Sequence, residues 1–147
     1  MLFTIPGKPQ GKMRPRYARK TGVMYTPAET VHYEKKVRDC FRIAGGEKIR
    51  ETKKVERDGR TVEVPQAIKV EVWAFIKPAE SAPKWKRELM LQNTIKPTKK
   101  PDADNIGKII LDALNGLAYE DDKQVTELVV HKAYSETRRV TVGVSEI

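Results

Sequence analysis

The sequence predicts an α+β protein, a single domain in which a small mixed β-sheet is flanked by helices. Three observations support this prediction. The length of 147 residues is enough to close one hydrophobic core without disulfides or metal staples. Apolar residues at helical spacing predict two main helices. Alternating apolar residues predict three longer strands, at residues 68–76, 124–134 and 138–147.

The first part of the chain predicts short strands separated by a basic loop. Residues 1–5 and 23–25 have the pattern of strands, and residues 8–20 form a loop interrupted by proline and glycine. Thr26 is placed as the N-cap of the first helix, which runs to Ala44 and stops at a pair of glycines.

The middle and end of the chain complete the expected elements. Residues 47–65 are mostly charged around an Asp-Gly turn and predict a charged hairpin or a mobile excursion. Residues 84–92 predict a short helix. The clearest helix begins at Asp104 or Asn105 and ends at an Asn-Gly pair. The last two strands, separated by only three residues, are expected to form a hairpin with each other.

The composition excludes several classes of protein. A single cysteine allows no internal disulfide and no cysteine-ligated zinc, and two histidines are too few for a histidine-rich metal cage. The N-terminus has no signal-peptide core, and no apolar run approaches the length of a membrane span. We therefore expect a cytoplasmic protein without a membrane partner.

The charge is unevenly distributed along the chain. The formal net charge is +9, and residues 1–60 contain 16 Lys or Arg against 7 Asp or Glu, which accounts for the whole surplus. Residues 101–122 show the opposite bias, with 6 acidic side chains and 1 basic one. A basic surface attracts a polyanion such as nucleic acid. An acidic patch within such a surface repels phosphate unless a cation lies between the carboxylates and the phosphate.

The acidic patch predicts a metal-dependent phosphodiester site. In an extended stretch, Asp102 and Asp104 would point the same way, and a strand pairing back would bring Asp122 beside them. Three carboxylates without histidine or cysteine suit Mg²⁺, with Mn²⁺ as a substitute. Lys108 would hold the scissile phosphate or stabilise the leaving oxygen. Asp112 is its partner on the same helix face.

A structural interpretation of the same residues stays open at this point. An Asp-x-Asp pair before a helix is often only an N-cap, and Asp121 and Asp122 fit an ordinary acidic turn. Lys108 and Asp112 fit a surface ion pair one helical turn apart.

Two groups of basic residues are candidates for DNA contacts. Those of the N-terminal loop would follow a phosphate backbone without reading bases, and those just before the acidic patch would steer DNA toward it. Either group could instead be a solvated segment. The candidates are Lys8, Lys12, Arg14, Arg16, Arg19, Lys20, Lys96, Lys99 and Lys100.

The acidic segment resembles the RusA family of Holliday junction resolvases, which are mostly carried by phages and prophages. The resemblance rests on Pro-Asp-Ala-Asp-Asn-Ile-Gly-Lys at 101–108, Leu-Asp-Ala-Leu-Asn-Gly at 111–116 and Glu-Asp-Asp-Lys-Gln-Val at 120–125. Near the N-terminus, Gly-Lys-Pro at 7–9, Lys-Met-Arg-Pro-Arg at 12–16 and Tyr-Thr-Pro at 25–27 are similar to the opening of Gram-positive phage members.

The resemblance implies a RusA-like fold and a magnesium-dependent endonuclease of DNA recombination and repair. Such an enzyme acts as a homodimer and cuts four-way junctions by paired symmetric nicks. By match of motif, Asp102, Asp104 and Asp122 would be its metal-binding and catalytic carboxylates and Lys108 its catalytic lysine. Supporting roles would fall to Asn105, Asp112 and Asp121.

Two other functions are compatible with the residues. One is a less selective metal-dependent nuclease, which would cut a linear duplex as fast as a junction. The other is a non-catalytic DNA-binding or replication accessory protein, in which the aspartates only cap a helix and binding does not respond to magnesium.

Overall fold

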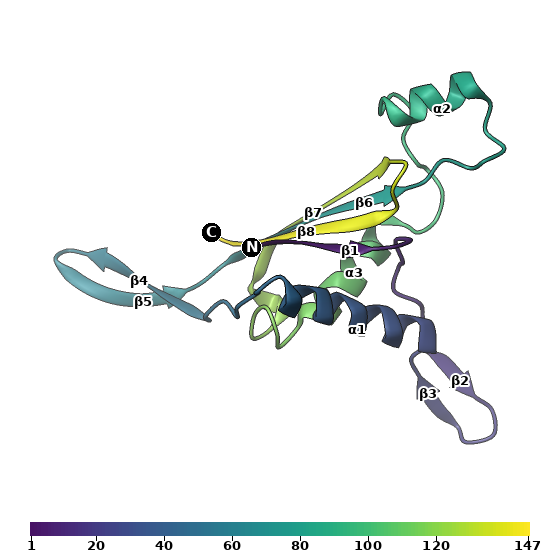
Figure 1. The fold of residues 1–147 in the computed structure, drawn as a ribbon. Coiled ribbons are helices and arrows are strands. Elements are labelled where there is room, and N and C mark those ends of the chain that lie inside the picture. The colour runs from purple at the N-terminus through teal and green to yellow at the C-terminus, as the bar shows by residue number, and fades with distance from the viewer.

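A four-stranded mixed sheet is the centre of the fold in the computed structural model, which describes residues 1–147 (Figure 1). Its strands lie in the order β1-β8-β6-β7. β6 is parallel to β7 and antiparallel to β8, which in turn is antiparallel to β1. The predicted α+β class is confirmed. The four strands are β1 (Leu2–Pro6), β8 (Arg139–Glu146), β6 (Ile68–Ile76) and β7 (Val125–Tyr134).

The predicted hairpin between the last two strands is wrong. β6 lies between β7 and β8 and pairs with both along nearly its whole length. The physical reason is the apolar content of β6, whose alternate residues are buried while Trp73 and Phe75 cover the C-terminal half of its second face. A strand apolar on both faces is most stable in the middle of a sheet.

Two helices cover one face of the sheet and enclose the core (Figure 1). They are α1 (Ala28–Ile43) and α3 (Ala103–Leu114). The isoleucines of α3 are buried against the sheet, as their helical spacing predicts. The prediction that Thr26 caps α1 is wrong by one residue, because Pro27 holds the N-cap position and no side chain caps the helix.

Two hairpins project from opposite ends of this core (Figure 1). The first pairs β2 (Arg16–Ala18) with β3 (Val23–Tyr25), so the predicted basic loop contains a strand. The second pairs β4 (Thr52–Arg57) with β5 (Arg60–Pro65) inside the charged segment. Its turn is the Asp-Gly pair, in which both residues have a positive φ, as this hairpin turn requires.

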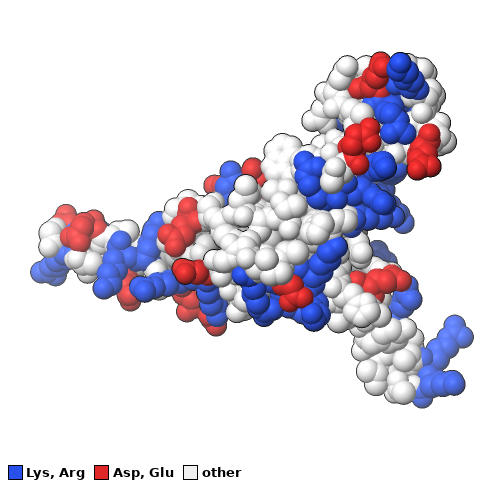
Figure 2. Space-filling view, in the orientation of Figure 1, with Lys and Arg blue, Asp and Glu red and all other residues white.

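The remaining two elements precede and follow α3 in the chain. The short helix α2 (Lys84–Leu91) comes before α3. Its Arg87 donates a hydrogen bond to the carbonyl of Ala79, in the loop that precedes α2, at 3.2 Å. A single 3₁₀ turn, η1 (Asp122–Gln124), leads into β7. No helix is long and apolar enough to cross a membrane. Lysine and arginine side chains lie mainly along the margins and projections of the visible face, and its centre is largely uncharged (Figure 2).

Candidate functional site

The N-terminus of α3 displays two of the predicted site residues. Asp102 occupies the N-cap position with an extended backbone, yet its side chain makes no capping hydrogen bond. Asp104 lies in the first turn of the helix. Both side chains are exposed and neither takes part in a hydrogen bond or an ion pair within the chain. Neither side chain therefore makes a capping hydrogen bond, although both lie where the helix favours negative charge.

The backbone between the two aspartates differs from the prediction. The chain is helical from Ala103, so Asp104 is not part of an extended stretch and does not cap the helix. The alternation that would point both carboxylates to one side therefore does not apply. What the two side chains share is the helix N-terminus, where the partial positive charge of the helix favours anionic groups and where an approaching phosphate would also be favoured.

A cleft of about 760 Å³ opens beside Asp102. Its walls are the loop 8–14 with Glu29 of α1 and, opposite them, Lys100 to Asp102 with Asn105. The amide of Lys12 donates to the carbonyl of Asn105 at 2.9 Å and fixes the loop to α3. Gly11 permits this contact, because a Cβ there would lie only 3.0 Å from the Cβ of Asn105.

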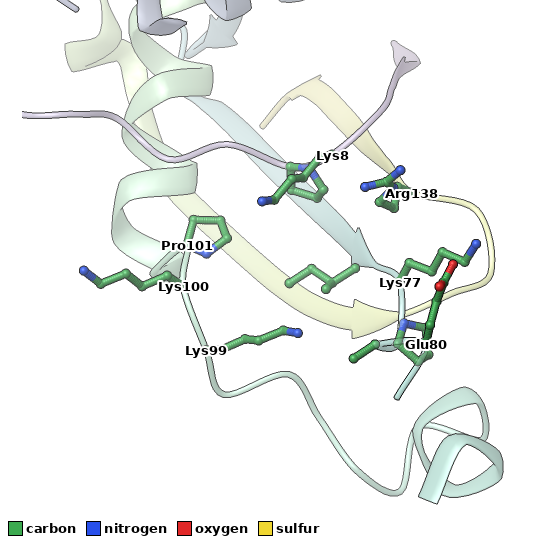
Figure 3. A pocket seen from close by; sticks show the side chains of 11 residues that line it. Lys8, Lys77, Glu80, Lys99, Lys100, Pro101 and Arg138 are labelled. Atoms are coloured by element: carbon green, nitrogen blue, oxygen red, sulfur yellow. The ribbon is translucent and has the colours of Figure 1, made fainter. Parts of the chain in front are cut away.

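A second cavity of about 430 Å³ adjoins this cleft and is strongly basic (Figure 3). Lys8, Lys100 and Pro101 line both spaces. Lys99 extends into the second cavity, whereas Lys100 turns away from it (Figure 3). The sheet contributes two cations that the sequence did not mark, Lys77 after β6 and Arg138 before β8. Neighbouring strand ends bring these two residues together, and no local motif identifies them.

Lys12 is already paired inside the protein. Its ammonium forms ion pairs with Glu34 and, at 3.1 Å, with Asp112. Partial burial disfavours the charged form, but the hydrogen bonds to the two carboxylates outweigh it and raise the pKa of Lys12. Lys12 thus connects the loop to α1 and α3, and it is less available to DNA than the other lysines of the loop.

The other predicted basic residues divide into three places. Arg14 lines the cleft, Lys99 lines the second cavity, and Lys8 and Lys100 line both. Lys96 is exposed and lines neither cavity. The remaining three belong to the β2–β3 hairpin: Arg16, Arg19 and Lys20.

Lys108 lies one helical turn beyond Asp104 and is exposed to solvent. Its ammonium is 3.7 Å from the carboxylate of Asp112, and its side chain is 62% exposed. An ion pair this exposed contributes little to stability. Lys108 can therefore leave Asp112 for an incoming phosphate at small cost, since Asp112 keeps its contact with Lys12.

The structure places Asp122 at the other end of α3. Its amide donates to the side-chain oxygen of Asn115, the C-cap of that helix, at 3.1 Å. The 12-residue helix is about 18 Å long, and Asp102 lies at its start. No group of three acidic, histidine or cysteine side chains is placed to share an ion within the chain. The expectation that Asp122 folds back beside Asp102 and Asp104 in one chain is therefore wrong.

The rest of the Asp-Asp-x-Gln motif holds the turn in which Asp122 lies. Asp121 accepts a hydrogen bond from the amide of Lys123 at 2.9 Å, and Gln124 completes a capping box with it. The Gln124 amide also donates to the carbonyl of Arg50 at 3.2 Å. Asp121 and Gln124 thus have structural roles here.

The electrostatic surroundings of Asp122 favour its protonated form. Burial is the first cause of its raised pKa, followed by a hydrogen bond with Asp121 and by repulsion from Asp121 and Asp112. Lys108 acts in the opposite direction. A nearby cation would relieve this repulsion between carboxylates.

The donor set fits a hard cation in part. Asp102 and Asp104 offer two free carboxylates, and Mg²⁺ is often held by one or two carboxylates together with water and substrate phosphates. One chain does not supply a third carboxylate at that place. A complete set of three would need Asp122 from elsewhere.

Comparison with known proteins identifies the family. A model of the endodeoxyribonuclease RusA family matches residues 6–145, so the chain belongs to this family. The chain is also 33% identical over 147 residues to the uncharacterized protein YqaN of Bacillus subtilis (strain 168). That match covers 99% of this chain and 95% of YqaN.

Membership of this family defines the class of enzyme. The protein is an endodeoxyribonuclease of the Holliday junction resolvase class, which hydrolyses phosphodiester bonds in branched DNA. The non-catalytic DNA-binding function is thereby excluded. Nucleases of this family generally depend on a divalent metal ion.

Proposed function

We propose that the protein is a magnesium-dependent, structure-selective endonuclease that resolves four-way DNA junctions in recombination and repair. It acts in the cytoplasm as a homodimer and introduces paired symmetric nicks. The observation that carries this proposal is the pair of unpartnered carboxylates, Asp102 and Asp104, at a helix N-terminus beside a basic cleft. Free carboxylates next to lysines that attract phosphate are the arrangement expected of a metal-assisted nuclease.

Each part of the site has a separate task in this proposal. Five basic residues bind the phosphates that lead to the site: Lys8, Arg14, Lys77, Lys99 and Arg138. Asp102 and Asp104 would hold a magnesium ion, which when bound would polarise the phosphate and activate a water. Lys108 contacts the scissile phosphate and stabilises the charge that develops on it.

The second subunit supplies the missing carboxylate. A two-fold axis across the middle of α3 would make the two copies of this helix antiparallel and place Asp122 of one copy beside Asp102 of the other. The neighbouring strand β7 is an edge strand, and Leu128 on it is 43% exposed. We therefore propose that α3 and β7 face the dimer axis. Each site is then shared, which couples cleavage to dimerisation.

The test is cleavage of a labelled four-way junction by the wild type and by Asp104→Asn. We expect magnesium-dependent paired nicks from the wild type. The Asp104→Asn variant should bind the junction with wild-type affinity but cut at least 100-fold more slowly, because a metal ligand is lost while the basic surface remains.

A matched control is Asp58→Asn in the turn of the β4–β5 hairpin, where the carboxylate is exposed and far from the cleft. This variant should cut like the wild type. Cutting by Asp104→Asn at the wild-type rate would refute the metal-site assignment. Equal wild-type rates on a junction and on a matched linear duplex would show a less selective nuclease.

A further inference from the structure

The β2–β3 hairpin is positioned at the entrance to the proposed site. β2 and β3 pair only with each other, and the hairpin projects freely beyond the start of α1 (Figure 1). Arg14 lines the same cleft as Asp102, and the first hairpin residue, Arg16, follows only two positions later. The hairpin therefore begins at the wall of the cleft.

Large apolar side chains cover this hairpin without being buried. Tyr17 and Met24 lie directly opposite each other on the two strands, and their side chains are 60% and 59% exposed. Val23 and Tyr25 are exposed as well. A two-stranded hairpin is only marginally stable by itself, so an apolar surface on one indicates burial against a partner.

The charge of the hairpin determines what kind of partner fits. No acidic residue precedes Glu29 in the sequence, whereas the hairpin and the loop before it are rich in lysine and arginine. In Figure 2 the body of the hairpin is uncharged and its tip carries only basic side chains. A partner that combines negative charge with flat apolar faces is a nucleic acid whose bases are accessible.

We propose that this hairpin inserts at the branch point of the DNA, where Tyr17 stacks on an exposed base and Arg19 and Lys20 contact the adjoining phosphates. The proposal rests on the proposed function. Inside a linear duplex both faces of every base pair are covered, but stacking is interrupted where arms meet. Tyr17 is thus a residue that determines specificity for branched over linear DNA.

Exposure also separates Tyr17 from another tyrosine near the proposed site residues. Tyr119, which lies in the acidic segment, is completely buried and donates from its hydroxyl to the carbonyl of Leu111 at 2.8 Å. It has no face available to a base. The sequence does not distinguish Tyr17 from Tyr119 as stacking residues, whereas their exposure does.

The test compares Tyr17→Phe with Tyr17→Leu in the Asp104→Asn background, in which the DNA stays intact. Phenylalanine keeps the ring, and leucine keeps an apolar contact with Met24 but removes the ring. We expect Tyr17→Leu to bind a four-way junction about ten-fold more weakly while its duplex affinity changes less than two-fold. Tyr17→Phe should keep the wild-type preference. Trp85→Leu, at a residue of α2 that is 63% exposed, is the matched control and should also keep it.

A second measurement locates the hairpin on the DNA. With 5-iodouracil at the branch point, irradiation should crosslink the base to Tyr17, and the same label in the middle of an arm should not. Three outcomes would each overturn this inference without refuting the proposed function. They are retention of the junction preference by Tyr17→Leu, crosslinking mainly in the arm, and loss of the dimer in Tyr17→Leu. A wild type without any junction preference would refute the proposed function and this inference together.

Discussion

At the scale of single residues, Lys12 shows how a motif residue acquires a structural role. The sequence marks it as one of six cations in a DNA-binding loop, but the fold places it between Glu34 and Asp112. A lysine with two acidic partners and an 18% exposed side chain contributes to stability through hydrogen bonds to charged groups.

We expect Lys12→Met to lower the free energy of unfolding by about 1–3 kcal/mol at neutral pH, because both carboxylates lose their shared counter-ion. The pKa of Lys12 is raised above 10.5, so this contribution is complete below that pH and is lost as the pH rises through the raised pKa. Urea unfolding of the wild type and the variant between pH 7 and pH 11 measures both effects.

The control for this prediction is Lys35→Met, which removes a pair with Asp39 at 2.9 Å in which the lysine is 70% exposed. An exposed pair of this kind should contribute much less to stability than the partly buried pair of Lys12. Equal losses in the two variants would contradict the structural role of Lys12.

Gly11 allows the closest approach of the loop to α3. We expect Gly11→Ala to destabilise the protein by about 1–3 kcal/mol and to weaken DNA binding, because the new Cβ would lie 3.0 Å from Asn105 and 3.1 Å from Pro101. Thermal unfolding and junction titration measure the two effects. Gly143→Ala is the control, since its nearest neighbour would be 3.8 Å away. Unchanged stability and affinity in Gly11→Ala would contradict the tight packing.

At the scale of elements, the β4–β5 hairpin is an addition to the fold. None of its residues belongs to the hydrophobic core cluster, and its strands pair only with each other. Thr52 and Pro65 are cross-strand partners at its base, so a two-residue turn can replace everything between them.

Replacement of residues 53–64 by Asn-Gly should therefore leave the domain folded. We expect circular dichroism in the far ultraviolet to keep its helical signal and the melting temperature to fall by no more than a few degrees, because only surface contacts such as that of Lys53 with the C-terminal carbonyl are lost. Loss of cooperative unfolding in this variant would show that the hairpin is an integral part of the core.

The periodicity of apolar residues predicted the main helices and strands correctly, but it did not predict which strands pair with each other. The alternation of residues 68–76 and the helical spacing of the α3 isoleucines are local consequences of burial, so they could be predicted. The partner of each strand depends on all the strands together. For this reason the predicted hairpin of β7 with β8 was wrong, although both strands exist.

At the scale of the whole molecule, the separation of Asp102 from Asp122 by the length of α3 has a testable consequence. If each site takes Asp102 and Asp104 from one subunit and Asp122 from the other, a mixed dimer of Asp104→Asn and Asp122→Asn contains one doubly altered site and one intact site.

We expect each variant alone to be inactive and the mixture, after subunit exchange, to nick one strand of the junction. The measurement is strand-resolved cleavage of a junction labelled on each arm, with a mixture of Asp104→Asn and Asp104→Ala as the control that restores nothing. A mixture of the two complementary variants that stays inactive, although mixed dimers are shown to form, would contradict the shared site.

The sequence alone determined the local features of this protein. Residue type and spacing were enough to predict the α+β class and the apolar faces of the main elements, because both depend on local physical chemistry. They also showed the excess of basic residues and the family that the motifs resemble. The aspartates, Lys108 and the basic loop were recognisable in the same way.

Only the tertiary structure decided which of these residues are free to act. It left Asp102 and Asp104 without partners, paired Lys12, brought Lys77 and Arg138 to the basic cavity and buried Tyr119 while exposing Tyr17. It also separated Asp122 from the other two aspartates, because α3 lies between them as a rigid helix about 18 Å long. Distances between residues far apart in the sequence depend on packing of the entire chain, and no local pattern encodes them.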